Sequence, residues 1–339
     1  MENPIDFSQI IAALLDNTVP FPPTLLNSLS GIYSTELLTL KQTWPQIAVE
    51  RRRALLEDLD QLADHDTLLD FDNVGRIALA DTDPVVLINA ISLLWQAEDK
   101  KLIPQFINFM QSHENEGVRA AAASALSPYV YLGELEKLPV ALQQQMEEAL
   151  LKANRTDRSL LVRRRALEAL GFSCREEVED LISKACQSTD TLWLESALCA
   201  IGRSADNHWD KQVLSFLDHA APEVQIAAVH AAGDLGISRA RQPLLELLAD
   251  EPEDEELRAE LIWALSQIGG ERVQETLEDL LDSTDDPDEI DLLEQALDNL
   301  SFTEDSTGFG LLDVEMDEED LVDDEDFDLD LYDDEEDDY

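Results

Sequence analysis

Six segments of the sequence share one spacing of apolar residues, and this repetition constrains the fold more than any other feature. In one copy Val162, Ala166, Ala169 and Leu170 stand at i, i+4, i+7 and i+8, which places them on one face of an α-helix, and Gly171 follows as a helix stop. The last apolar position of each copy falls at 94, 126, 170, 201, 232 and 265, with a weaker copy at 297, so successive steps are 32, 44, 31, 31, 33 and 32 residues. A step near 32 is typical of stacked helical hairpins. The spacing therefore predicts an all-α chain folded as a right-handed α-solenoid.

The repetition divides the chain into three predicted parts. Residues 1–44 contain short apolar stretches interrupted by Pro20-Phe21-Pro22-Pro23, and we expect short helices there that cap the first hairpin. Residues 45–300 form the predicted solenoid, and its one long step, between Leu126 and Leu170, holds an insertion of the kind that often carries recognition. Residues 301–339 are predicted to be a disordered acidic tail.

Small residues explain why such hairpins would stack. Alanine at the second and third positions of the repeated face lets neighbouring helices approach closely, so each hairpin buries its apolar stripe against the next one. Trp193 occupies the first position of this face in its own copy, and we expect it in the core.

The charge of the chain restricts its partners. The formal net charge is −52; no Lys or Arg follows Arg272, and residues 273–339 hold 31 of the 75 acidic side chains. Such a field repels nucleic-acid phosphates and anionic membranes and attracts basic partners. We therefore expect a protein partner, no direct contact with nucleic acid and no membrane contact.

The sequence predicts neither a catalytic site nor a bound cofactor or metal. It contains no H-E-x-x-H, G-x-S-x-G or glycine-rich phosphate loop, and its three cysteines, Cys174, Cys186 and Cys199, fit neither a disulfide framework nor a C-x-x-C metal site. His219 and His230, with Asp234 nearby, make a two-helix metal site thinkable, but polar surface is the simpler interpretation. A first segment without the basic residues of a signal peptide, and no apolar run of the ~20 residues that a membrane helix needs, favour a cytoplasmic protein.

The repeated segments resemble the HEAT repeat, and more narrowly the bacterial HEAT-like repeat that is also found in phycobilisome lyases. The second helix of that repeat reads Val-Arg, two residues, Ala, two residues, Ala-Leu-Gly, which Val162-Arg163 to Ala169-Leu170-Gly171 match. Leu257-Arg258 keeps the arginine, whereas Trp193 and Val224 are followed by other residues, so the expected arginine ladder is broken there. The resemblance covers about residues 66–300, and it implies an α-solenoid that binds other macromolecules on its grooved face.

Two groups of residues are candidates for binding a partner. The first group consists of arginines in and after the insertion. They form either ion pairs within and between repeats or an anion-docking patch, for which arginine is suited because it binds carboxylates in a bidentate manner. A second group stands at one equivalent position in successive repeats, which we call a column. Trp263 shares this column with Glu168, Cys199, His230 and Gln295, and we expect the column to border the inner groove. Trp263 there is either a binding hot spot or partly buried in the core. The candidates are Arg155, Arg158, Arg163, Arg164, Arg165, Glu168, His230 and Trp263.

The leading hypothesis for function is a non-enzymatic scaffold that binds a protein partner on its concave helix row and uses the acidic tail as a second contact. One alternative is an acidic chaperone or nucleic-acid mimic for basic proteins. Another is an enzyme like the HEAT-like lyases and DNA glycosylases, which the acidic groove and the lack of a bilin-binding feature disfavour. We further expect the tail, in which apolar residues alternate with acids, to fold back on the arginine group when no partner is present; the alternative is a tail that serves solubility alone.

Overall fold

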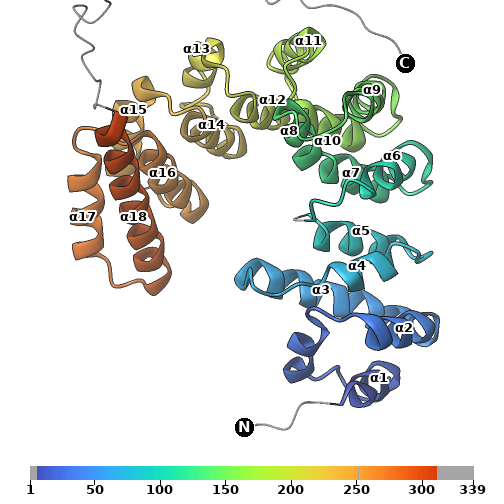
Figure 1. The fold of residues 1–339 in the computed structure, drawn as a ribbon. Helices are drawn as coiled ribbons and strands as arrows, with labels where there is room; N and C mark the ends of the chain where they lie inside the picture. The colour runs from blue at the N-terminus through green and yellow to red at the C-terminus, as the bar shows by residue number, and fades with distance from the viewer. Residues whose placement is uncertain (1–5, 96, 251, 311–339) are drawn as a thin grey trace, which may run out of the picture.

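The computed structural model describes residues 6–95, 97–250 and 252–310, and within them every regular element is a helix. The helices form two rows that follow an arch, and successive helices of the inner row lie side by side on its concave side (Figure 1). The prediction of an all-α solenoid of helical hairpins is thereby confirmed. The inner row consists of α3 (Val49–His65), α5 (Pro84–Leu93), α7 (Glu116–Ala125), α10 (Leu160–Leu170), α12 (Thr191–Arg203), α14 (Pro222–Asp234), α16 (Glu255–Ile268) and α18 (Pro287–Gly310).

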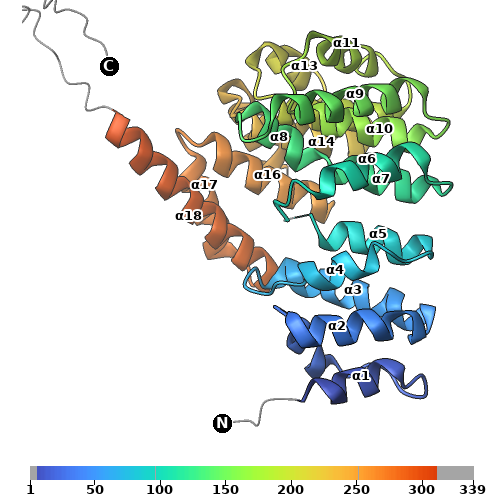
Figure 2. The same ribbon diagram turned by 45° about the vertical axis from the view of Figure 1, so that its right-hand side comes forward.

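The outer row supplies the first helix of each hairpin. Its short members α13 and α15 are each preceded by a 3-10 turn, η3 (Asn207–Trp209) and η4 (Ser238–Ala240). Figure 2 shows the outer helices α9, α11 and α13 lying over the inner helices of the same repeats. The row consists of α4 (Asp72–Ala78), α6 (Leu102–Ser112), α9 (Val140–Thr156), α11 (Glu176–Ala185), α13 (Asp210–Leu214), α15 (Arg241–Ala249) and α17 (Val273–Ser283).

The N-terminal segment packs at one end of the arch (Figure 1). It comprises α1 (Phe7–Leu15), η1 (Pro23–Leu29), α2 (Ser34–Thr43) and η2 (Trp44–Gln46), and it buries Leu14, Leu29 and Leu40 completely. It is tied to the first hairpins by hydrogen bonds from the Gly31 amide to the Asp70 carbonyl, 2.7 Å, and from the Trp44 indole to Asp81, 2.8 Å.

Polar residues in the turns determine where the inner helices begin. The carboxylate of Asp83 accepts hydrogen bonds from the first amides of α5, and Asn115, Asp190 and Asp254 do the same for α7, α12 and α16. These side chains satisfy backbone donors that have no partner within the helix. Each hairpin turn therefore carries its own start signal for the helix that lines the concave side.

The repeated apolar face forms the core, with one exception. Val86, Val118, Val162 and Val224 are fully buried at its first position, but Trp193 is only half-buried, and the neighbouring Leu194 takes the core position. The expectation of a core tryptophan is therefore wrong. Because the core position is taken by the next residue, the indole lies at the edge of the apolar stripe. There the Cζ atom of Arg163 lies 5.7 Å from the centroid of the indole ring.

Two features of the chain were not indicated by the sequence: an extra helix in the insertion and the length of the last helix. The insertion between the second and third copies contains a complete extra helix, α8 (Ser127–Glu134), whose Tyr129 is buried and donates a hydrogen bond to the Ala97 carbonyl. The last helix, α18, runs to Gly310, so the boundary placed after residue 300 falls inside a helix. The remainder of the predicted acidic tail, residues 311–339, lies outside the described residues.

Candidate functional site

A cavity on the concave side crosses four successive inner helices. It has a volume of about 430 Å³ and is lined by side chains from α10, α12, α14 and α16. Because these helices come from four different repeats, only the stacked array creates this surface. The lining residues are Arg164, Arg165, Glu168, Leu192, Glu195, Ser196, Cys199, Glu223, Ile226, Ala227, His230, Glu256 and Glu260.

Half of the eight candidate residues meet in this cavity. Arg164, Arg165, Glu168 and His230 line it, and Cys199, the equivalent of Glu168 one repeat later, lies between them. Trp263 stands at the next equivalent position and contacts His230. The column of equivalent positions thus runs along this cavity, and Trp263 is half-buried within it.

The arginine end of the cavity is partly neutralised. Arg165 forms an ion pair with Glu168 at 2.6 Å, and the Ser196 hydroxyl donates to the other carboxylate oxygen of Glu168 at 2.7 Å. Glu168 is buried, and Arg203 donates to its backbone carbonyl at 2.8 Å. Glu168 therefore has its hydrogen-bonding capacity used inside the protein, which favours a structural role for this candidate.

The remainder of the cavity carries an excess of negative charge. Glu195, Glu223, Glu256 and Glu260 line it, and burial together with the neighbouring Glu223 raises the pKa of Glu195. One carboxylate oxygen of Glu195 is buried without a hydrogen-bond partner among the described residues, as is Nε of Arg164. Unpaired buried polar atoms of this kind are costly unless a ligand or water satisfies them.

His230 is held between an aromatic ring and two carboxylates. Its ring stacks on Trp263, its Nδ1 lies 2.7 Å from Glu260 and its Nε2 lies 3.5 Å from Asp234. The hydrogen bond to Glu260 raises the pKa of His230, although burial opposes the shift. Burial raises the pKa of Asp234. The group joins α14 to α16 at the wall of the cavity.

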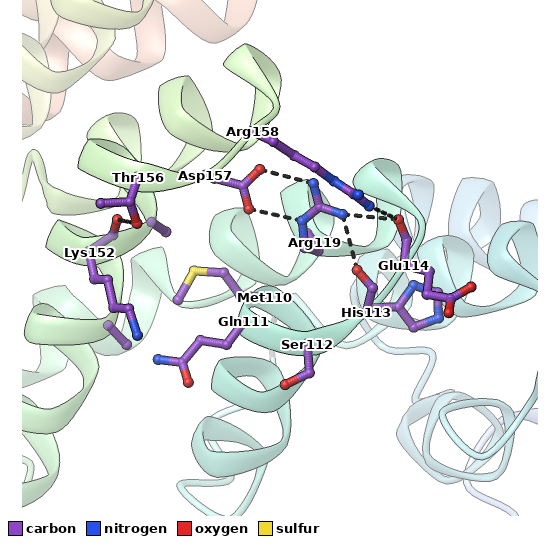
Figure 3. Close-up of a pocket in the computed structure, with 12 residues that line it drawn as sticks. Met110, Gln111, Ser112, His113, Glu114, Arg119, Lys152, Thr156, Asp157 and Arg158 are labelled. Carbon is purple, nitrogen blue, oxygen red and sulfur yellow. Dashed lines mark hydrogen bonds and ion pairs between the residues drawn. The ribbon is translucent and has the colours of Figure 1, made fainter.

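The other three candidate arginines lie elsewhere. Arg155 and Arg163 line a cavity between the ends of α9 and α11 and the starts of α10 and α12, and Arg163 donates to the Asn154 carbonyl at 2.6 Å. Arg158 lines a further cavity beside α6, where it donates to the Glu114 carbonyl at 2.9 Å (Figure 3). The five arginines are thus distributed over three surfaces and do not form one patch.

The arginine of the repeat motif serves packing between repeats. Arg119 is 3% exposed, binds Asp157 of the next hairpin through two hydrogen bonds of 2.9 Å and donates to the His113 and Glu114 carbonyls (Figure 3). Arg53 pairs in the same way with Asp83, and Arg258 with Glu289. At Arg163 the equivalent partner one repeat later is the ring of Trp193.

Sequence reasoning missed the glutamates of the cavity. Glu195, Glu223, Glu256 and Glu260 precede members of the Cys199, His230 and Trp263 column by three, four or seven residues, which is one or two helical turns. A scan of those neighbouring turns would have found them. The signal was obscured because acidic residues are abundant throughout this chain.

Metal ligands and thiols give no sign of a reactive centre in the part of the chain that is described. There, no three His, Cys, Asp or Glu side chains are placed to hold a metal ion, and His219 accepts a hydrogen bond from the Ala221 amide. The three cysteines are free thiols, and burial raises the pKa of Cys199. None of the described helices is both long and apolar enough to cross a membrane.

Comparison with known proteins identifies the repeat. The family model for HEAT repeats matches residues 74–144 and 211–298, so the copy around Val162 lies between the matched ranges. No curated protein matches the sequence. The stacked hairpins of the structure agree with this HEAT-repeat match.

Three solved structures resemble this chain, all with TM-scores below 0.5. Escherichia coli YibA is 17% identical, with a TM-score of 0.42, over 84% of this chain and 98% of its own. Human deoxyhypusine hydroxylase is 18% identical, with a TM-score of 0.34, over 77% and 95%. Kap95p, solved with RanGDP, is 14% identical, with a TM-score of 0.39, over 87% of this chain and 40% of its own. Residues 74–144 and 211–298 of this chain are HEAT repeats by the family model.

Proposed function

We propose that this protein is a non-enzymatic interaction scaffold whose inner helices bind a positively charged segment of a protein partner. The observation that carries the proposal is the charge of the inner cavity, in which five glutamates and two arginines are drawn from four helices. Arg165 is paired with Glu168 and Glu260 with His230, whereas the exposed Glu223 and Glu256 have no ion pair among the described residues. Lysine or arginine side chains of a partner would pair with the exposed carboxylates of Glu223 and Glu256.

The side chains of the cavity favour binding over catalysis. The raised pKa of Cys199 keeps its thiol protonated, and a protonated thiol is a poor nucleophile. His230 is already bound to Glu260 and stacked on Trp263, so it is not presented as a free base. The eighteen acidic residues from Asp313 on would add a second, longer-ranged contact to a basic partner.

A matched pair of double variants tests the proposal. Glu223→Gln with Glu256→Gln removes two exposed charges from the inner cavity, and Glu246→Gln with Glu278→Gln removes two exposed charges from the outer helices α15 and α17. Proteins captured from native lysate by the full chain should be lost with the inner variant and kept with the outer one. A chain ending at Gly310 separates tail contacts from inner contacts. Equal capture by both double variants would exclude the inner cavity as the binding site.

A further inference from the structure

The cavity lined by Arg155 and Arg163 differs in charge from the others. It has a volume of about 420 Å³ and opens at the edge of the solenoid where the hairpin turns lie. No carboxylate lines it, whereas each of four other cavities has at least two. Its lining residues are Asn154, Arg155, Leu160, Arg163, Leu181, Lys184, Ala185, Ser188 and Trp193.

The lining combines a cationic rim with an apolar floor. Arg155, Arg163 and Lys184 supply the positive charge, and the half-buried indole of Trp193 lies beneath the Arg163 guanidinium. Leu160 is 53% exposed although it is a large apolar side chain. A surface of this kind suits a segment that carries both carboxylates and apolar side chains.

The chain itself contains such a segment beyond Gly310. Residues 311–339 hold eighteen acids and no Lys or Arg, and they include Leu321-Val322, Phe327, Leu329 and Leu331-Tyr332. Twenty-nine residues span up to ~95 Å when extended. The start of α18 is three inner helices away from α12, ~30 Å at the usual spacing between packed helices, and Gly310 lies a further 24-residue helix length, ~36 Å, from that edge. The two steps together come to roughly 50 Å. The segment is long enough to reach the cavity.

We infer that residues 311–339 dock in this turn-edge cavity, with carboxylates on Arg155, Arg163 and Lys184 and apolar side chains on Leu160 and Trp193. Tethering gives a flexible segment an effective concentration of the order of ~1 mM, so a weak contact suffices for occupancy. This site contains two of the five arginines grouped from the sequence, because Arg158, Arg164 and Arg165 lie on other surfaces. The inference does not depend on the proposed inner binding surface, since the two cavities share no lining residue.

Carbodiimide cross-linking of the full chain tests the contact, because it joins a lysine amine to a carboxylate only where the two are adjacent. Lys184 is the lysine of the cavity, and Lys41, Lys137, Lys152 and Lys211 are equally exposed lysines at other places. Mapping by mass spectrometry should find residues 311–339 joined mainly to Lys184. The yield at Lys184 should fall ~10-fold between 0.1 and 1 M salt as the screening length shortens. Cross-links spread evenly over all five lysines would overturn the inference.

Two exposed leucines provide a variant and its matched control. Leu160 is the first residue of α10 and lines this cavity; Leu192 is the second residue of α12, 47% exposed, and lines the inner cavity. An acid is tolerated in the first turn of a helix, so neither Leu160→Glu nor Leu192→Glu should unfold the chain. Leu160→Glu should lower the Lys184 cross-link ~5-fold through like-charge repulsion, and Leu192→Glu should leave it unchanged.

Mixing isotopically labelled and unlabelled chains identifies the source of the docked segment. Cross-links within one chain support docking of the protein's own residues 311–339. Cross-links found only between labelled and unlabelled chains would assign the cavity to a second copy and overturn the inference as stated.

Discussion

The imidazole of His230 stacks on the indole of Trp263 across the interface of α14 and α16, with ring centroids 4.4 Å apart and planes inclined by 11°. Gly233 makes this approach possible, because a Cβ at that position would lie 2.6 Å from the Trp263 ring. The same imidazole is bound to Glu260 and lies near Asp234. One contact between repeats therefore depends on the protonation of a single ring.

Stability should decrease as the pH rises past the pKa of His230. The hydrogen bond to Glu260 raises that pKa, so the stabilisation is complete below the unfolded value of ~6.5 and is lost as the pH rises through the folded value. The charge of Asp234 also raises the pKa of His230, and the charge of Arg203 lowers it. Denaturant unfolding at pH 6 and pH 8.5 should show a smaller difference for His230→Gln than for the wild type. An identical difference in both proteins would contradict this reading of the contact.

Gly171→Ala should destabilise the chain by about 1–3 kcal/mol, the usual cost of overpacking. A Cβ at Gly171 would meet the backbone of Ala200 at 2.7 Å, and backbone cannot move aside as a side chain does. Gly117→Ala is the control, since its nearest neighbour is the flexible end of Ile88 at 2.9 Å and alanine favours helix. Free energies of unfolding from denaturant titrations would compare the two; a Gly171 variant as stable as the Gly117 variant would mean that α10 and α12 pack less closely.

Arg119→Met should cost about 3 kcal/mol, because it leaves Asp157 without its partner in a nearly closed site. Adding Asp157→Asn removes the unpaired charge, so the double variant should be less destabilised than the sum of the single variants. Arg165→Met is the comparison and should cost less, since Arg165 is exposed and the buried Glu168 keeps its hydrogen bond from the Ser196 hydroxyl. Additive effects at Arg119 and Asp157 would refute their coupling.

Alkylation should distinguish the cysteines. A hydrogen bond to Glu134 raises the pKa of the exposed Cys174 thiol, and burial raises the pKa of Cys186 to about 11. Because the thiolate is the reactive form, Glu134→Gln should accelerate the reaction of Cys174 with iodoacetamide at pH 8 and leave Cys186 unchanged. Rates followed by mass spectrometry give both values in one sample, and an unchanged rate at Cys174 would exclude Glu134 as the cause.

The sequence by itself determined the repeat and its inner face. Val86, Val118, Val162 and Val224 occupy the first position of the repeated face in four of its copies, and all four are buried. Local chemistry also determined helix starts, as at Asp83 before Pro84 and at Asp254. These features are readable because each depends on residues within one or two helical turns of each other.

Tertiary structure alone decided what the side chains at the edges of that face do. Trp193 and Leu194 are neighbours on one helix, and the packed repeats bury Leu194 and leave the indole at the edge, beneath Arg163 of the previous repeat. Arg163, Arg164 and Arg165 are consecutive, yet Arg163 lines one cavity and its two neighbours line another, because successive helical residues are rotated by about 100°. The candidate sites belong to surfaces assembled from several repeats. The rotation and distance between repeats depend on how side chains of neighbouring hairpins pack, which the periodicity of the sequence does not show.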